Sequence, residues 1–182
     1  MYKFKAVAQN EIVVFGAARP GYSDKEVLNW IDFVRQHNIQ RVCCLLTQRS
    51  LENYSNLVET YRQKFGIDRI CWAPIEDFHL CDLSMLTQQI LPFLATATRQ
   101  QQKVVVHCSG GIGRTGQILA AWLVYQHRYS NRDAIAMVIK MGRNPYESAI
   151  FDLFTGKNIF TSIHELNLML DRSRSHNRSI EC

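Results

Sequence analysis

Short apolar runs alternate along this chain with longer segments whose apolar residues recur every three or four positions. The runs of strand character cover residues 11–15, 41–46, 68–73 and 103–106. The segments of helical periodicity cover residues 23–34, 54–65, 83–94, 114–127 and 130–141, and a further helix resumes after 145 and continues to 170. Strands that alternate with helices predict an α/β domain, with a mostly parallel central sheet flanked by helices on both faces.

Local signals predict where some of these helices begin, bend and end. Ser23, followed three residues later by Glu26, forms a capping box that opens the first helix. Gly142 is expected to end the 130–141 helix, and Pro92 predicts a kink in the helix that contains it. The 114–127 segment is apolar on most of its faces, so we expect it to be the buried central helix.

The length of 182 residues suits one well-buried core and is short for two. We therefore predict a single domain over residues 1–171. Residues 172–182 are polar and basic, and we expect them to form a C-terminal tail outside that domain. The net charge of +5 favours phosphorylated substrates, because a positive field attracts anions. Basic residues are not interleaved with aromatic ones, so nucleic acid is not an expected partner.

The apolar runs and the cysteines indicate where in the cell the protein is expected. No apolar run approaches the ~20 residues of a membrane span, and the N-terminus lacks the apolar stretch of a secretion signal. We expect a cytoplasmic protein that makes no membrane contact. The six cysteines include no Cys-x-x-Cys pair, and a chain of this size does not need disulfides. Free thiols, no metal and no cofactor are therefore expected.

The sequence His-Cys-Ser-Gly-Gly-Ile-Gly-Arg-Thr-Gly at residues 107–116 carries the chemistry. It lies between a predicted strand and a predicted helix, and its glycines let successive N–H groups point at one anion. The helix start adds its own N–H groups and dipole, and Arg114 adds a fork of donors that matches two phosphate oxygens. Cys108 lies at the base of this loop, where its neighbours favour the thiolate, so it is a candidate nucleophile.

This stretch could also be a buried structural cysteine or a nucleotide-binding loop. A lone cysteine is usually a small buried hydrophobe, and a glycine-rich loop before a helix also suits nucleotides. The nucleotide loop, however, requires Gly-Lys-Ser/Thr, and no lysine is present here. The dinucleotide pattern requires an acidic residue after a second strand, and neither is evident. The pattern therefore favours phosphate transfer.

These residues resemble the signature of cysteine-dependent protein tyrosine and dual-specificity phosphatases, and the resemblance spans about residues 13–150. The family usually has alanine where Gly110 stands, a change that should add only some loop freedom. The resemblance implies a phosphocysteine at Cys108, and a Thr115 hydroxyl that hydrogen-bonds the cysteine sulfur and helps it leave. His107 is expected to orient the loop through hydrogen bonds. The implied phosphate-binding residues are Ser109, Gly110, Gly111, Ile112, Gly113 and Arg114.

Hydrolysis also needs an acid to protonate the departing oxygen. Residues 74–78, Pro-Ile-Glu-Asp-Phe, follow a predicted strand, where the family often has Pro-Ile-Pro-Asp-Phe with the aspartate as general acid. The resemblance assigns this role to Asp77, and Glu76 remains the alternative. Arg19 and Arg143 are weaker candidates for the border of the pocket.

The expected function is a tyrosine or dual-specificity phosphoprotein phosphatase that hydrolyses phosphomonoesters through a phosphocysteine. Phosphorylated proteins or peptides are the expected substrates, phosphate, sulfate and vanadate the expected loop anions, and a monomer the expected state. The alternatives are a phospho-ligand binding module with little turnover, a phosphatase of inositol lipids, nucleotides or RNA ends, and a sulfurtransferase or arsenate reductase. Cys81 is a candidate to trap an oxidised Cys108.

Overall fold

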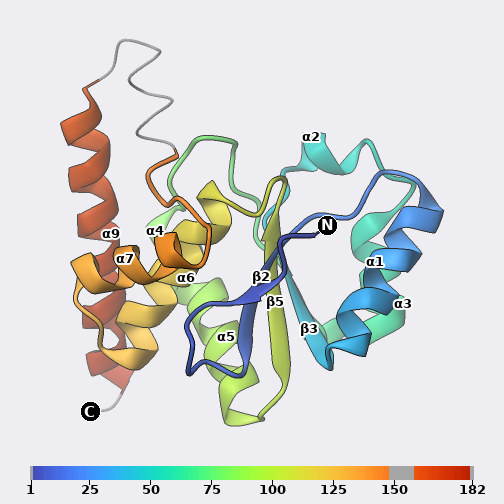
Figure 1. Ribbon diagram of the computed structural model, residues 1–182, viewed down its shortest axis with the longest axis horizontal. Coiled ribbons are helices and arrows are strands. Elements are labelled where there is room, and N and C mark those ends of the chain that lie inside the picture. Colours follow the sequence, from blue (N-terminus) through green and yellow to red (C-terminus); the bar gives the residue numbers. More distant parts are fainter. Residues whose placement is uncertain (1, 148–157, 181–182) are drawn as a thin grey trace.

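The computed structural model describes residues 2–147 and 158–180, and the sheet forms its centre (Figure 1). The five strands are ordered β1-β2-β5-β3-β4. Their bounds are β1 (Lys5–Ala6), β2 (Val14–Ala18), β3 (Ile39–Cys44), β4 (Ile70–Trp72) and β5 (Lys103–Cys108). β1 pairs antiparallel with β2, and the other pairings are parallel. The predicted, mostly parallel sheet is therefore confirmed.

Helices cover both faces of this sheet, as predicted (Figure 1). α1 and α3 lie on one face, whereas α5 and α6 lie on the other, with α7 and α9 packed on the outside of α6. The helical bounds are α1 (Asp24–Gln36), α2 (Gln48–Leu51), α3 (Leu57–Phe65), η1 (Ile67–Arg69), α4 (Leu83–Met85), η2 (Leu86–Ile90), α5 (Leu91–Arg99), α6 (Gly113–His127), α7 (Asn131–Lys140) and α9 (Ile159–Ile180).

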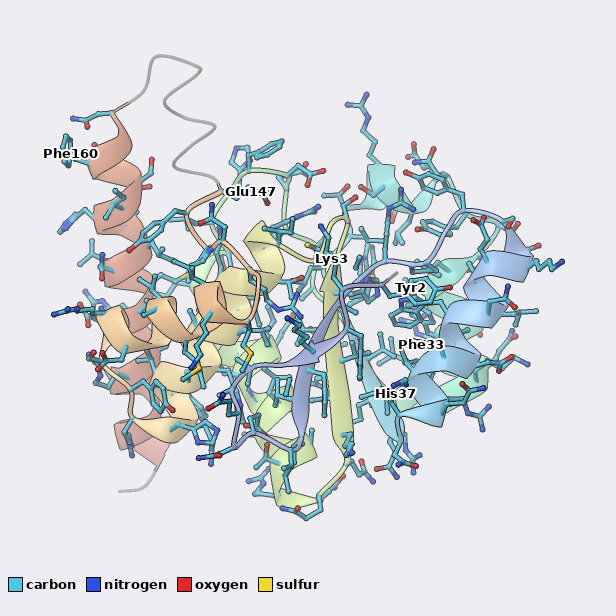
Figure 2. The ribbon with its side chains drawn as sticks, viewed as in Figure 1. Tyr2, Lys3, Phe33, His37, Glu147 and Phe160 are labelled. Carbon is cyan, nitrogen blue, oxygen red and sulfur yellow. The ribbon has the colours of Figure 1, made fainter. Side chains whose placement is uncertain are left out.

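The smaller of two apolar cores lies between the sheet and α1 and α3, and Trp30 and Tyr61 are its largest buried side chains. An aromatic group at its edge fixes the N-terminal segment. The ring of Tyr2 lies 5.1 Å from that of Phe33 of α1, and Phe33 also contacts His37 (Figure 2). The residues before β1 are thereby held against α1.

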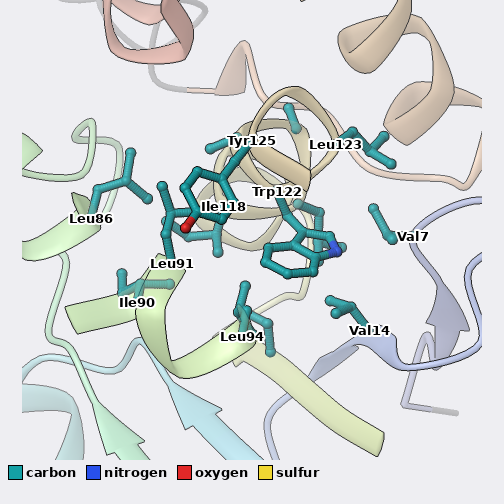
Figure 3. Packing of buried hydrophobic residues seen from close by; sticks show 14 of the residues in the cluster. Val7, Val14, Leu86, Ile90, Leu91, Leu94, Ile118, Trp122, Leu123 and Tyr125 are labelled. Carbon is teal, nitrogen blue, oxygen red and sulfur yellow. The ribbon is translucent and has the colours of Figure 1, made fainter. Parts of the chain in front are cut away.

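The larger core surrounds α6, in which every residue from Gly113 to Tyr125 is buried. Figure 3 shows Trp122 and Ile118 of this helix among the side chains of η2 and α5. Full burial of one large apolar side chain contributes about 1.5–3 kcal/mol. The prediction of a buried central helix is confirmed, and its burial fixes the direction in which its N-terminus points.

The local helix signals are confirmed, with one refinement at Pro92. Ser23 and Glu26 form the predicted capping box, and Gly142 follows α7 with a φ of 84°. Pro92 does not interrupt a regular α-helix. It is the second residue of α5, directly after the π-helical turn η2, and the N–H of Leu91 donates to Leu86 O. The widened turn accommodates a residue that has no N–H and whose ring crowds the preceding turn.

The first predicted strand begins later than expected, for a reason visible at Glu11. Its carboxylate accepts hydrogen bonds from the N–H groups of Val13, at 2.7 Å, and Val14, at 3.3 Å. These hydrogen bonds form a local turn over residues 11–14, where the sequence predicted the start of a strand. The pairing with β5 consequently starts at Val14.

The C-terminal helix corrects the expected boundary at residue 171. α9 continues to Ile180 without a break there. Ser173 is fully buried and its hydroxyl donates to Met169 O, while Arg174 donates to Tyr129 O and to the side chain of Asn131. Packing therefore carries the domain at least to Arg174. Within residues 2–147 and 158–180, no helix combines the length and apolarity that a membrane crossing requires.

Glu11 links β2 to the far end of α6, because its Oε2 also accepts from Trp122 at 3.1 Å and from His127 at 2.7 Å. Burial favours the protonated carboxyl, but the bonds from His127, Val13, Trp122 and Val14 outweigh it and lower the pKa of Glu11. We predict that Glu11→Gln lowers the free energy of unfolding at pH 7 by about 1–3 kcal/mol.

This loss should depend on pH with a definite sign. A lowered folded-state pKa gives stability that is fully present above the ordinary value of 4.5 and is lost as the pH falls through the folded-state pKa. Urea unfolding should show the gap between wild type and Glu11→Gln narrowing below about pH 4.5. The exposed Glu52→Gln serves as the control. A gap that is constant from pH 3 to 7 would contradict a stabilising Glu11 carboxylate.

Candidate active site

The predicted loop lies at the carboxyl end of β5, between the two neighbouring parallel strands. Ala18 of β2 is paired with Cys108, and Cys44 of β3 is paired with His107. Cys108 is 2% exposed, and α6 begins five residues later at Gly113. The loop therefore connects a buried strand end directly to a buried helix N-terminus, where free N–H groups favour an anion.

The two central glycines of the loop have different roles. Gly111 has a φ of 69°, and a Cβ there would lie 2.5 Å from Ala17 O and 2.6 Å from Ala18 N. A side chain at Gly110 would meet nothing within 4 Å, and its backbone does not have a positive φ. Only Gly111 is required for the loop to lie against the end of β2, because an L side chain there is both strained and blocked.

Arg114 is fixed by the ends of the strands beside it. Its guanidinium is 3% exposed, and Nη1 donates to Ile75 O at 2.7 Å and to Leu45 O at 3.4 Å. Nη2 forms an ion pair with a carboxylate oxygen of Asp77. Two backbone carbonyls thus hold the guanidinium at Nη1, while its Nη2 meets the carboxylate of Asp77 in the loop of residues 74–78, called the acid loop below.

The acid loop brings Asp77, rather than Glu76, to the cysteine loop. The Asp77 side chain is 56% exposed and contacts Arg114, whereas Glu76 is exposed and, among the described residues, makes no hydrogen bond or ion pair with the cysteine loop. The next residue, Phe78, has a φ of 60°, a left-handed conformation that costs a bulky residue of order 1–3 kcal/mol. Of the two carboxylates that the sequence left open, the geometry favours Asp77.

His107 and Thr115 are both fully buried. The ring of His107 lies 5.2 Å from that of Trp30 and 5.7 Å from that of Tyr61. Burial lowers the pKa of His107 to about 3, so the imidazole is neutral at physiological pH. In the part of the chain that the structure describes, neither ring nitrogen of His107 makes a hydrogen bond, so the expected hydrogen bonds that would orient the loop are not seen. Within the described residues, Thr115 Oγ1 makes no hydrogen bond, so the expected bond to the Cys108 sulfur is not seen.

The two arginines that sequence reasoning suggested only weakly both bind the loop. The N–H of Arg19 donates to Ser109 O at 3.2 Å, and its Nε donates to Ser109 Oγ at 3.4 Å. Arg143 donates from Nη1 to Gly111 O. Neither residue belongs to the 107–116 motif, and only the fold brings them to it.

A cavity of about 510 Å³ lies near this site and was not predicted. Tyr54 connects the two, because it lines the cavity and its hydroxyl accepts a hydrogen bond from Arg19 at 3.0 Å. The walls come from α2, α3, β4 and the segment between the two helices. The lining residues are Gln48, Leu51, Glu52, Tyr54, Ser55, Asn56, Leu57, Val58, Glu59, Arg62 and Trp72.

Five cysteines are free thiols in the described chain, namely Cys43, Cys44, Cys71, Cys81 and Cys108. Burial raises the pKa of Cys81 to about 12, so this thiol is neutral at physiological pH and a weak nucleophile. Its suggested redox partnership with Cys108 thus gains no support from its ionisation. Across residues 2–147 and 158–180, no three His, Cys, Asp or Glu side chains are grouped to hold a metal ion.

One family model matches most of this chain. Residues 25–177 match the model of the dual specificity phosphatase catalytic domain. The chain belongs to this family. The putative tyrosine phosphatase 123R of Invertebrate iridescent virus 6 is 30% identical over 80 residues, which cover 44% of this chain and 56% of the relative. The dual specificity protein phosphatase 5 of Homo sapiens is 33% identical over 63 residues, which cover 35% and 16%.

A solved structure has the same fold. The crystal structure of PTPMT1 superposes with a TM-score of 0.69 at 16% identity and covers 98% of this chain and 99% of that one. At this identity the likeness establishes the fold. The chain spans only 56% and 16% of the two curated relatives described above.

The two loop glycines provide a paired prediction. We expect Gly111→Ala to abolish detectable tungstate binding, because its Cβ would push the loop off the end of β2, and to lower the free energy of unfolding by about 1–3 kcal/mol. Gly110→Ala should bind tungstate normally and gain about 0.4–1 kcal/mol through a stiffer unfolded chain. Calorimetric titration and urea unfolding measure both. Equal binding by the two variants would refute the assigned loop geometry.

Proposed function

We propose that this protein is a tyrosine or dual-specificity phosphoprotein phosphatase that acts through a phosphocysteine at Cys108. The observation that carries this proposal is the meeting of three groups at the carboxyl edge of the sheet. Cys108 lies at the base of a loop that ends on a helix N-terminus, and Arg114 and Asp77 meet beside it. A nucleophile, a phosphate fork and an acid are the groups that phosphomonoester hydrolysis requires.

In the first step, the Cys108 thiolate attacks phosphorus, and the bond between phosphorus and the ester oxygen breaks. Asp77 gives its proton to that oxygen, so that an alcohol or phenol leaves. Negative charge is spread over the three equatorial oxygens during transfer. The N–H groups of residues 109–114 and the Arg114 guanidinium stabilise this charge, and they are positioned before the reaction begins.

In the second step, water attacks the phosphocysteine and Asp77 accepts a proton from that water. The phosphorus–sulfur bond breaks, inorganic phosphate forms, and the Cys108 thiolate is regenerated. Thr115 is proposed to assist this departure through a hydrogen bond that its hydroxyl donates to the sulfur. His107 is proposed to support the loop from its apolar surroundings.

The proposal also covers substrates, partners and compartment. Residues that flank the phosphorylated side chain would occupy the cavity beside Tyr54, which suits a peptide or protein better than a small phosphate ester. Phosphate, sulfate and vanadate would bind the loop. We further propose a cytoplasmic monomer that binds neither nucleic acid nor membrane, a setting consistent with the free thiols of the described chain.

The role of Asp77 can be tested through the leaving group. A nitrophenolate departs readily without a proton, whereas an ordinary phenol or alkyl alcohol does not. Asp77→Asn should therefore slow the poorer leaving groups most, by up to the ~10²–10⁴-fold that general acid catalysis contributes. The measurement is kcat/KM for a series of aryl phosphates, with Glu76→Gln as the matched control. A uniform loss for every leaving group would reject Asp77 as the acid.

The Asp77–Arg114 ion pair generates a second prediction. A bound phosphate would compete with the Asp77 carboxylate for Nη2 of Arg114, and two anions in one site repel each other. Asp77→Asn should bind tungstate about 1.5- to 5-fold more tightly, the range set by a half-exposed ion pair. Calorimetric titration at low salt measures this change. Unaltered or weaker binding would show that Asp77 does not compete with the ligand.

A further inference from the structure

We propose that Arg143 is a positioning residue of this active site, which holds the phosphate loop from behind and turns its N–H groups toward the substrate. The inference rests on the proposed phosphatase function and deepens it. Arg143 lies outside the 107–116 motif, between α7 and the segment that leads to Tyr146. It is 3% exposed, so it is part of the interior.

The guanidinium bridges two segments that are far apart in the sequence. Nη1 donates to Gly111 O in the phosphate loop, and Nη2 donates to Lys3 O at 3.2 Å. Lys3 is itself held in place, because the ring of Tyr2 packs on Phe33 and Ala18 N–H donates to Tyr2 O at 2.7 Å (Figure 2). Arg143 therefore fastens the loop to an anchored stretch of backbone.

The surrounding backbone leaves room for this side chain at two glycines. A Cβ at Gly16 of β2 would lie 2.6 Å from both Cζ and Nη2 of Arg143. A Cβ at Gly116 of α6 would lie 3.4 Å from Cβ of Arg143 and 3.2 Å from Pro145 N. The end of α7 completes the site, because Arg143 N–H donates to Val138 O and turns the chain back toward the loop.

The hydrogen bond to Gly111 O has a direct effect on the neighbouring N–H. In a planar trans peptide, the carbonyl and the next N–H point in opposite directions. Because Arg143 holds the Gly111 carbonyl behind the loop, the Ile112 N–H is turned to the other side, where a phosphate would bind. A loop that is fixed in this way does not need to reorganise when charge develops on the phosphate.

Arg143 holds the loop as a charged group. Burial lowers its pKa to about 10, so the guanidinium is charged at neutral pH. A charged donor makes a stronger hydrogen bond to Gly111 O than a neutral donor would. The two-point contact also depends on the planar fork of arginine, which a lysine of the same charge does not provide.

Two variants of the full chain test this role. Arg143→Met should weaken tungstate binding about 10-fold or more, the scale of one lost hydrogen bond to a charged group. Arg143→Lys keeps the charge but loses the bridge, so its tungstate binding should also be weak and its kcat for an aryl phosphate should be low.

Arg41→Met is the matched control. Arg41 is also buried, but its side chain donates to Gln102 and Gln100 at the opposite end of β5. This variant should lower the melting temperature and leave tungstate binding and kcat/KM per folded molecule unchanged. If Arg143→Met does not fold, Arg143→Lys alone decides the matter through tungstate affinity.

The outcomes distinguish this inference from the proposed function. Wild-type tungstate affinity in both folded Arg143 variants, with only a lower melting temperature, would overturn the positioning role. Wild-type protein that binds tungstate but hydrolyses no phosphate ester would overturn the proposed function. In that case the tungstate affinities of the variants would still test Arg143.

Discussion

The candidate site depends on one constraint, which is that a loop of a few residues must turn several N–H groups toward a single anion. A loop this short can do so only if its carbonyls are held on the other side. Arg19 N–H binds the carbonyl of Ser109, and the Arg143 guanidinium binds that of Gly111. The buried end of β5 and the buried start of α6 fix the two ends of the loop. The packing of the large core therefore determines the geometry of the site.

Charge is distributed unevenly around this loop. The buried Arg114 and Arg143 stand beside Cys108, while His107 is neutral because burial lowers its pKa to about 3. The partly exposed Asp77 carboxylate forms an ion pair with Arg114, and we propose that a phosphate takes the place of this carboxylate when it binds. Buried cations are costly unless they are hydrogen-bonded, and here backbone carbonyls provide those bonds. This arrangement favours the binding of an anion at the loop.

Local signals made much of the fold and the centre of the site predictable. The capping box at Ser23 and the helix over residues 114–127 depend on residues that are close in the sequence. The order of strand, loop and helix around Cys108 depends on such local residues as well. Predictions failed where a distant or unexpected contact decided the outcome. Glu11 delays the start of β2, and burial of Ser173 carries α9 past residue 171. The role of Arg143 had no sequence signal beyond its charge, because its partners lie 32 and 140 residues away.

The central claim is that Cys108 forms a covalent bond to phosphorus during turnover. The most direct measurement is acid quenching of wild-type protein within the first turnovers of an aryl phosphate, followed by mass spectrometry of the Cys108 peptide. The account predicts a phosphoryl group on the sulfur of Cys108, formed in a burst with the released phenol and absent from Cys108→Ser. Steady hydrolysis with an unmodified Cys108 peptide at every quench time would contradict it.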